Sequence, residues 1–229
     1  MSLARRHKAQ VLNQAALSKE MLNKVTTQPL GDYEFYKTQL EQHLKTLKDI
    51  KDHAEKAQFK RDKFSEYLPY LEQYVTDGKT HPNLVLSEMV VWLFDARELK
   101  PALKWAAIAL EQNQAMDNKR FNKNLAEFVC DALYDEASQA LEEKREFEFF
   151  DFAVKGMDAW QVNTVVKGKT YAMAGKLAEA QGDKDDALAF YQQAMQANDK
   201  AGVKKRITEL EKELNQLPDS EETGEKETA

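Results

Sequence analysis

The side chains that could carry chemistry in this chain are mostly charged, and the most informative ones lie near the N-terminus. The first 24 residues contain a single acidic side chain, Glu20, and five basic ones. The basic residues are Arg5, Arg6, Lys8, Lys19 and Lys24. Such side chains neutralise phosphates, and their binding weakens steeply with salt. These five residues are therefore candidate DNA contacts, and the alternative interpretation is a solvated helix end.

The net charge of −6 would by itself argue against a polyanionic partner, but the charge is unevenly distributed. Residues 1–60 contain 11 Lys and Arg against 7 Asp and Glu, whereas the rest of the chain contains 22 against 32. A second basic cluster at 204–206 is followed by acidic residues, which is typical of a solvated helix. Residues 218–229 are acidic with few apolar side chains, which predicts a disordered tail.

No motif for catalysis, for a metal or for a cofactor is present. The segment 168–170, Gly-Lys-Thr, resembles the end of a phosphate loop, but Asn163 stands where the first Gly is required. No C-x-x-C or H-E-x-x-H spacing exists. A two-metal nuclease needs clustered carboxylates, yet the acidic residues at 142–148 are more typical of a solvated face. His43 and Cys130 are interpreted as packed side chains. We assign no catalytic residue, no metal ligand and no cofactor.

The composition predicts an all-α protein, because Ala, Leu, Glu, Lys and Gln dominate while Gly and Pro are few. A first helix is expected at 2–25, and Pro29 and Gly31 interrupt the chain after it. A long, coiled-coil-like helix is expected at about 33–67, ending before Pro69. Along this helix, the residues of a largely apolar seam that begins at Tyr36 recur at alternating steps of four and three. This heptad spacing predicts either packing of the helix along its own domain or self-association. The candidate oligomerisation residues on this seam are Tyr36, Leu40, Leu47, Ile50 and Phe64.

Beyond residue 68 the pattern changes to shorter helices. The segment 83–94 is apolar nearly all round, which predicts a central core helix. Residues 99–113 align with residues 184–198 at an offset of 85, and within this alignment Ala102 matches Ala187 and Ala109 matches Ala194. This predicts a degenerate stack of helical hairpins similar to tetratricopeptide (TPR) repeats. The expected organisation is a basic helix at 1–30, the heptad helix at 31–68, a TPR-like domain at 69–217 and an acidic tail at 218–229.

Several segments, taken in order, resemble a known family. They are residues 2–9 (SLARRHKA), 67–71 (YLPYL), 91–95 (VWLFD), 101–110 (PALKWAAIAL), 182–188 (GDKDDAL) and 201–214 (AGVKKRITELEKEL). Their order and spacing resemble the small terminase subunit family of temperate contractile-tailed phages and prophages, whose members are often labelled the terminase endonuclease subunit. The resemblance covers residues 2–216. The acidic tail departs from relatives that end in basic residues.

The resemblance implies recognition of double-stranded viral DNA at the cohesive-end site, and partnership with a large subunit that holds the ATPase motor. It also implies a homo-oligomer, commonly a ring, in the cytoplasm of the bacterial host. No stretch of the sequence is long and apolar enough to predict a membrane span. Two alternatives stay open at this point. One is a metal-dependent endonuclease that cuts the site itself, and the other is a TPR-like scaffold for protein partners.

Overall fold

The computed structural model describes residues 33–215, and the secondary structure in this part of the chain consists of helices, without a strand. The expected helix at 2–25 and the acidic tail lie outside the described residues. The chain divides between Asp117 and Asn118 into two compact units. This boundary falls inside the range 69–217 that the sequence assigned to one domain. No described helix has the length and apolar character needed to cross a bilayer.

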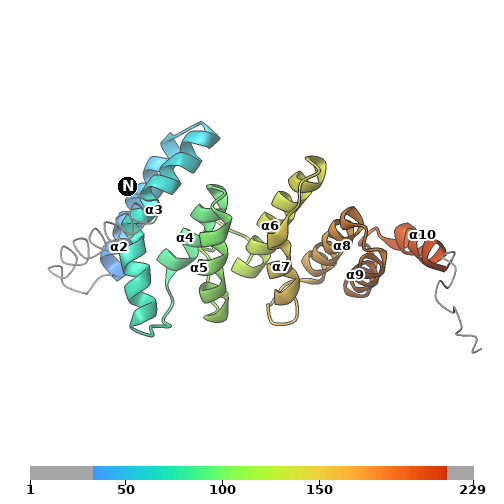
Figure 1. Ribbon diagram of the computed structural model, residues 1–229. Helices are drawn as coiled ribbons and strands as arrows, with labels where there is room; N and C mark the ends of the chain where they lie inside the picture. Colours follow the sequence, from blue (N-terminus) through green and yellow to red (C-terminus); the bar gives the residue numbers. More distant parts are fainter. Residues whose placement is uncertain (1–32, 216–229) are drawn as a thin grey trace, which may run out of the picture. The chain divides into compact units, whose positions relative to one another are not determined.

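The first unit contains four described helices (Figure 1). They are α2 (Tyr33–Asp49), α3 (His53–Thr76), α4 (Leu84–Asp95) and α5 (Leu99–Glu111). Helix α4 contacts the other three. Its residues 85–94 are all buried, so the prediction of a central core helix is confirmed. Apolar burial on this scale is the main stabilising contribution to the unit.

The prediction of one continuous helix over 33–67 is wrong, because the chain leaves the helical conformation at residues 50–52. Asp52 adopts an extended conformation there, and its side chain accepts a hydrogen bond from the Glu55 amide at 2.8 Å. It thereby caps the start of α3. Helices α2 and α3 contact each other as an antiparallel pair, with Gln39 bonded to Glu66. A four-and-three spacing is satisfied equally well by two helices that turn their apolar faces to one core.

The predicted stop before Pro69 is also wrong, because α3 continues through this proline to Thr76. Proline removes one backbone hydrogen bond and normally kinks or ends a helix. Tyr67, Leu71 and Tyr74 flank the proline, and each is at most 1% exposed. Burial of these three large side chains outweighs the cost of the lost hydrogen bond.

The second unit begins with α6 (Leu125–Glu142), followed by the short helices η1 (Glu148–Phe150) and α7 (Asp151–Gly156). The remaining helices are α8 (Thr164–Gln181), α9 (Lys184–Ala197) and α10 (Lys204–Asn215). Helix α8 packs against α9 and against α6, and α10 packs on α9. Figure 1 shows α8 and α9 side by side as a hairpin.

Two glycines allow α8 and α9 to approach closely. A Cβ atom at Gly175 would lie 2.6–2.9 Å from three ring atoms of Tyr191, and one at Gly168 would lie 2.7 Å from the Cβ of Asn198. Both glycines are buried within α8. The sequence Gly168-Lys169-Thr170 is therefore part of a packed helix and does not form a phosphate loop.

The internal repeat occupies corresponding places in the two units. Residues 99–113 include α5, and residues 184–198 include α9, so each copy is the second helix of a hairpin. The matched residues Ala102 and Ala187 are both fully buried. The turn before each copy contains a residue with positive φ, Arg97 at 59° and Gly182 at 87°. The equivalence thus extends to the left-handed backbone that ends the preceding helix.

Candidate functional site

The five basic residues predicted to contact DNA, at positions 5, 6, 8, 19 and 24, lie outside the described residues. Their role stays a prediction. The described part of the chain contains no group of three or more His, Cys, Asp or Glu side chains placed to hold a metal ion. The acidic side chains of Glu142, Glu143, Glu146 and Glu148 are exposed, as the sequence predicted.

The predicted oligomerisation residues are divided between two helices and the turn between them. Tyr36, Leu40 and Leu47 lie on α2, Ile50 lies in the turn, and Phe64 lies on α3. Leu40 is 1% exposed and Leu47 is 7% exposed within a single chain, while Tyr36 stacks on Tyr70 with ring centroids 4.6 Å apart. The seam is therefore largely used in the chain's own packing. Its part in assembly stays a prediction.

His43 lies inside an aromatic cluster of the first unit, as a packed and hydrogen-bonded residue. Its Nδ1 is 2.8 Å from the Tyr67 hydroxyl, and its ring contacts the edges or faces of Phe59, Tyr67 and Trp92. Burial lowers the pKa of His43 below its usual 6.5, and the nearby Glu66 carboxylate opposes this shift only in part. The folded state therefore favours the neutral imidazole.

The depressed pKa of His43 predicts that the first unit loses stability in mild acid. Below pH 6.5 the unfolded chain binds a proton at this residue more readily than the folded chain does. The contribution of neutral His43 to the stability of the folded state is thus complete above pH 6.5, and it is lost as the pH falls toward the folded-state pKa of His43. Thermal unfolding at pH 7.5 and pH 5.5 should show a larger fall in Tm for the wild type than for His43→Gln. His53→Gln, which removes an exposed histidine, is the control, and parallel profiles for His43→Gln and wild type would contradict the prediction.

Cys130 is a buried thiol, as predicted from its apolar neighbours in sequence. It is 1% exposed, and burial raises its pKa to about 12. A thiol with this pKa is almost entirely protonated at neutral pH, so it lacks the thiolate that a nucleophile needs.

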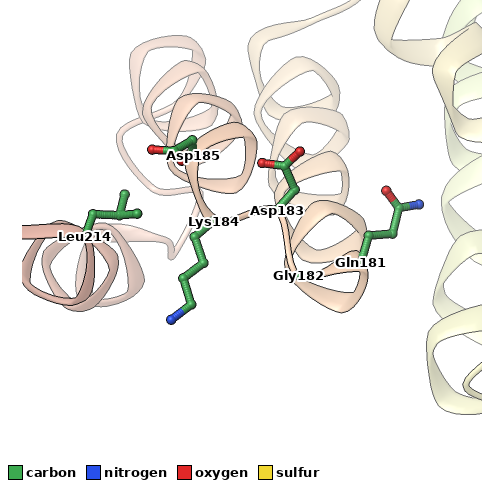
Figure 2. Close-up of a pocket in the computed structure, with 6 residues that line it drawn as sticks. All are labelled: Gln181, Gly182, Asp183, Lys184, Asp185 and Leu214. Carbon is green, nitrogen blue, oxygen red and sulfur yellow. The ribbon is translucent and has the colours of Figure 1, made fainter. Parts of the chain in front are cut away.

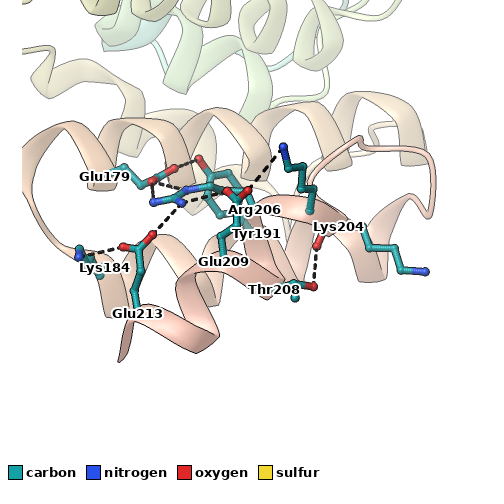
Figure 3. A network of polar contacts seen from close by, with 9 residues as sticks. Glu179, Lys184, Tyr191, Lys204, Arg206, Thr208, Glu209 and Glu213 are labelled. Atoms are coloured by element: carbon teal, nitrogen blue, oxygen red, sulfur yellow. Dashed lines mark hydrogen bonds and ion pairs between the residues drawn. The ribbon is translucent and has the colours of Figure 1, made fainter. Parts of the chain in front are cut away.

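A polar network ties α10 to the α8–α9 hairpin (Figure 3). The Arg206 guanidinium donates from Nε to Glu179 at 2.6 Å and from Nη1 to Glu213 at 3.0 Å and Glu209 at 3.2 Å. Tyr191 donates its hydroxyl hydrogen bond to Glu179 as well. Lys184 pairs with Glu213 and Lys205 with Glu209, so three cations face three carboxylates. The predicted basic cluster at 204–206 thus includes a structural residue whose charge is neutralised within the chain.

A shallow hollow lies beside this network, where the α8–α9 turn meets the end of α10 (Figure 2). Its lining residues are Gln181, Gly182, Asp183, Lys184, Asp185 and Leu214. Asp183 accepts a hydrogen bond from the Asp186 amide as the cap of α9, and Lys184 is paired with Glu213. These two polar side chains already have structural roles, and the hollow presents no arrangement suited to catalysis.

A different group of charges lies on α6, α8 and the segment before α6. Asp131 binds two lysines, with Lys123 Nζ 2.6 Å from Oδ2 and Lys169 Nζ 3.3 Å from Oδ1. The Lys169 ammonium also lies over the Tyr134 ring, 4.1 Å from its centroid. Burial would raise the pKa of Asp131, but the hydrogen bonds and charges of Lys123 and Lys169 lower it overall. This Lys123–Asp131–Lys169 triad therefore carries one more positive than negative charge.

No pattern in the sequence predicted the triad. Lys123 and Asp131 are eight residues apart, and Lys169 follows 38 residues after Asp131. Helix α6 and helix α8 bring them together, with Glu127 holding the two helix starts in place. Glu127 accepts hydrogen bonds from the Asn163 amide at 3.2 Å and from the Asn163 side chain at 2.6 Å, and its other oxygen accepts from the Asn124 amide at 3.4 Å.

Comparison with known proteins gives a consistent result. The chain is 29% identical over 206 residues to the probable terminase, endonuclease subunit of Haemophilus phage HP1 (strain HP1c1), covering 83% of this chain and 73% of the relative. It is 28% identical over 188 residues to the terminase, endonuclease subunit of Escherichia phage P2, covering 82% and 76% of the two chains. No solved structure matches. The family model described as phage small terminase subunit matches residues 37–163, more than half of the chain, and the chain therefore belongs to the phage small terminase subunit family.

Proposed function

We propose that this chain is the DNA-recognising subunit of a phage terminase, which binds double-stranded viral DNA at the cohesive-end site and recruits the large ATPase subunit for cutting and packaging. Membership of the small terminase subunit family is the observation that carries the proposal. The charge distribution supports it, because five of the six charged side chains in the first 24 residues are basic. Side chains of that kind bind phosphates.

We further propose that several copies act together. Five basic residues in one chain bind DNA weakly, but copies joined in a ring present their arms at a high effective concentration. Leu40 and Leu47 are covered within one chain, so little of their surface is left for a neighbouring copy. Native mass spectrometry of the purified chain should give particles of more than one copy, and a strict monomer would remove the basis for multivalent binding.

The DNA-binding proposal is tested by neutralising Arg5, Arg6, Lys8, Lys19 and Lys24 to Gln in one variant. We expect the wild type to bind a duplex carrying the cohesive-end site at low salt, with affinity falling steeply as salt rises, and the variant to lose binding. Each lost phosphate contact lowers the slope of log K against log salt by about 0.9. Fluorescence anisotropy across a salt series measures both quantities.

The matched control changes the net charge by the same amount at five exposed lysines of the second unit. These are Lys144, Lys155, Lys200, Lys204 and Lys212. The control should keep most of the affinity, because the proposal assigns binding to the N-terminal arm and not to net charge. Equal loss in both variants, or a wild type that does not bind DNA at low salt, would refute the proposal.

A second candidate function is cleavage of the site by this chain itself. The names of the two relatives, each an endonuclease subunit, favour it. The purified chain would then nick the cohesive-end duplex in the presence of Mg²⁺ or Mn²⁺. Cleavage only after addition of a large subunit would assign the chemistry to that partner.

A third candidate is a TPR-like scaffold that docks a protein partner. The equivalent hairpin positions of α5 and α9 favour it, since Ala102 and Ala187 are buried alike in the two copies. Within the terminase proposal, the TPR-like range, residues 69–217, would provide the docking surface for the large subunit. A scaffold without a DNA role would leave the duplex unbound in the anisotropy experiment.

A further inference from the structure

We propose that the Lys123–Asp131–Lys169 triad, with Tyr134, forms a second phosphate-binding surface for double-stranded DNA, separate from the N-terminal arm. The inference rests on the proposed DNA-binding function and adds a contact surface within the second unit. It follows from how the two lysines are held, from their unbalanced charge and from their exposure.

The triad holds two ammonium groups in fixed positions. Each oxygen of Asp131 takes one lysine, and the Tyr134 ring lies under Lys169. An ammonium has three donors, and each lysine here directs one of them to Asp131. The side chains of Lys123 and Lys169 are 35% and 43% exposed, so both can meet a ligand from solvent. Holding the long side chains in place in advance reduces the conformational entropy that binding costs.

The charge of the triad sets it apart from the polar network around Arg206. That network pairs three cations with three carboxylates, whereas the triad has two cations and one carboxylate. Glu127 lies one turn before Asp131, but its carboxylate accepts hydrogen bonds at the N-terminal ends of α6 and α8. The partial positive charges of these helix ends offset its negative charge. Asp135, exposed one turn after Asp131, is the opposing charge on this face.

The surroundings of the triad suit a DNA backbone. Val165 is 62% exposed and lies one helical turn before Lys169, so an apolar contact adjoins the cations. Phosphates alternate with apolar sugar faces along a DNA strand, which matches cations beside an exposed aliphatic side chain. The surface would add to the N-terminal arm in contacting the same duplex.

The test compares the full chain with Lys123→Gln/Lys169→Gln by fluorescence anisotropy on a cohesive-end duplex of about 30 base pairs. We expect the double variant to bind about fivefold more weakly for each lost phosphate contact near 0.15 M salt, and its salt slope to fall by about 0.9 per contact. Asp131→Asn should raise the affinity, because removing the neutralising charge beside both cations has a larger effect than the looser hold on their side chains. Lys123→Arg/Lys169→Arg should bind like the wild type.

The matched control is Lys155→Gln/Lys200→Gln, which removes the same charge from exposed positions elsewhere in the second unit. Circular dichroism verifies the fold of every variant. If Lys123→Gln/Lys169→Gln does not fold, the increase in DNA affinity predicted for Asp131→Asn decides the test. If wild type binds, the N-terminal variant fails to bind, and both Lys123→Gln/Lys169→Gln and Asp131→Asn bind like wild type, the triad proposal is overturned while the proposed function stands. If wild type itself does not bind at low salt, both fall.

Discussion

Replacement of Trp92 by alanine is expected to cost about 3–5 kcal/mol in the free energy of unfolding of the first unit, the range measured for buried Trp and Phe truncations. Trp92 lies on α4 and is 1% exposed. Its ring contacts His43 on α2 and both Phe59 and Tyr67 on α3, at centroid distances of 5.8–6.4 Å. Its removal leaves a cavity where three helices meet.

The measurement that checks this is hydrogen exchange of the whole chain, read separately in the two units. Trp92→Ala should lose protection in residues 33–117 and keep it in residues 118–215, because the contacts of Trp92 belong to the first unit. Trp92→Phe is the control. It keeps an aromatic ring and forfeits no hydrogen bond, since the indole Nε1 has no acceptor among the described residues. Equal loss of protection across both units would contradict the expected independence.

Gly175→Leu is expected to destabilise the second unit by about 3 kcal/mol or more, at or above the upper end of overpacking effects. Even a single Cβ at this position would lie 2.6 Å from the Tyr191 ring. The ring has no room to turn aside, because it is 2% exposed and its hydroxyl is bonded to Glu179. The larger side chain must therefore separate α8 from α9 and disturb the Arg206 network.

Chemical denaturation followed by circular dichroism measures this effect. Lys176→Leu places the same side chain one residue further along α8, at an exposed position, and should stay within about 0.5 kcal/mol of wild type. Gly175→Ala should have a free energy of unfolding between those of Gly175→Leu and Lys176→Leu. The helix preference of Ala over Gly, about 1 kcal/mol, offsets part of the cost of its clash with Tyr191. Equal stability of Gly175→Leu and Lys176→Leu would show that the helices can separate without cost.

The sequence predicted the helical class and several helix bounds because the local signals there are strong. Helix α8 was expected at 164–181 and is found there, with Asn163 as its cap and Gly182 in the left-handed conformation after it. The core helix was predicted from a continuous apolar run, and such a run can be identified without knowing which helices pack against it. Such features depend only on residues adjacent in sequence.

The failures come from choices that the local pattern does not decide. A heptad seam fits one long helix or two shorter ones, and a single cap at Asp52 selected the hairpin. Pro69 is tolerated within α3 only because the surrounding side chains are buried. The triad depends on the packing of α6 against α8, which places Lys169 beside a carboxylate 38 residues earlier. No pattern within one helix predicts that contact.

The neighbour-by-neighbour packing of the helices has a consequence for how the chain acquires its structure. Helix α4 packs with α5, α8 with α9 and α9 with α10, so the loops that must close are short. Folds with mostly local contacts form rapidly, and domains commonly fold in order during synthesis. The first unit can thus be complete while α6 is still inside the ribosomal exit tunnel. A nascent chain stalled far enough beyond residue 117 for the whole first unit to have left the tunnel should already resist proteolysis in that unit.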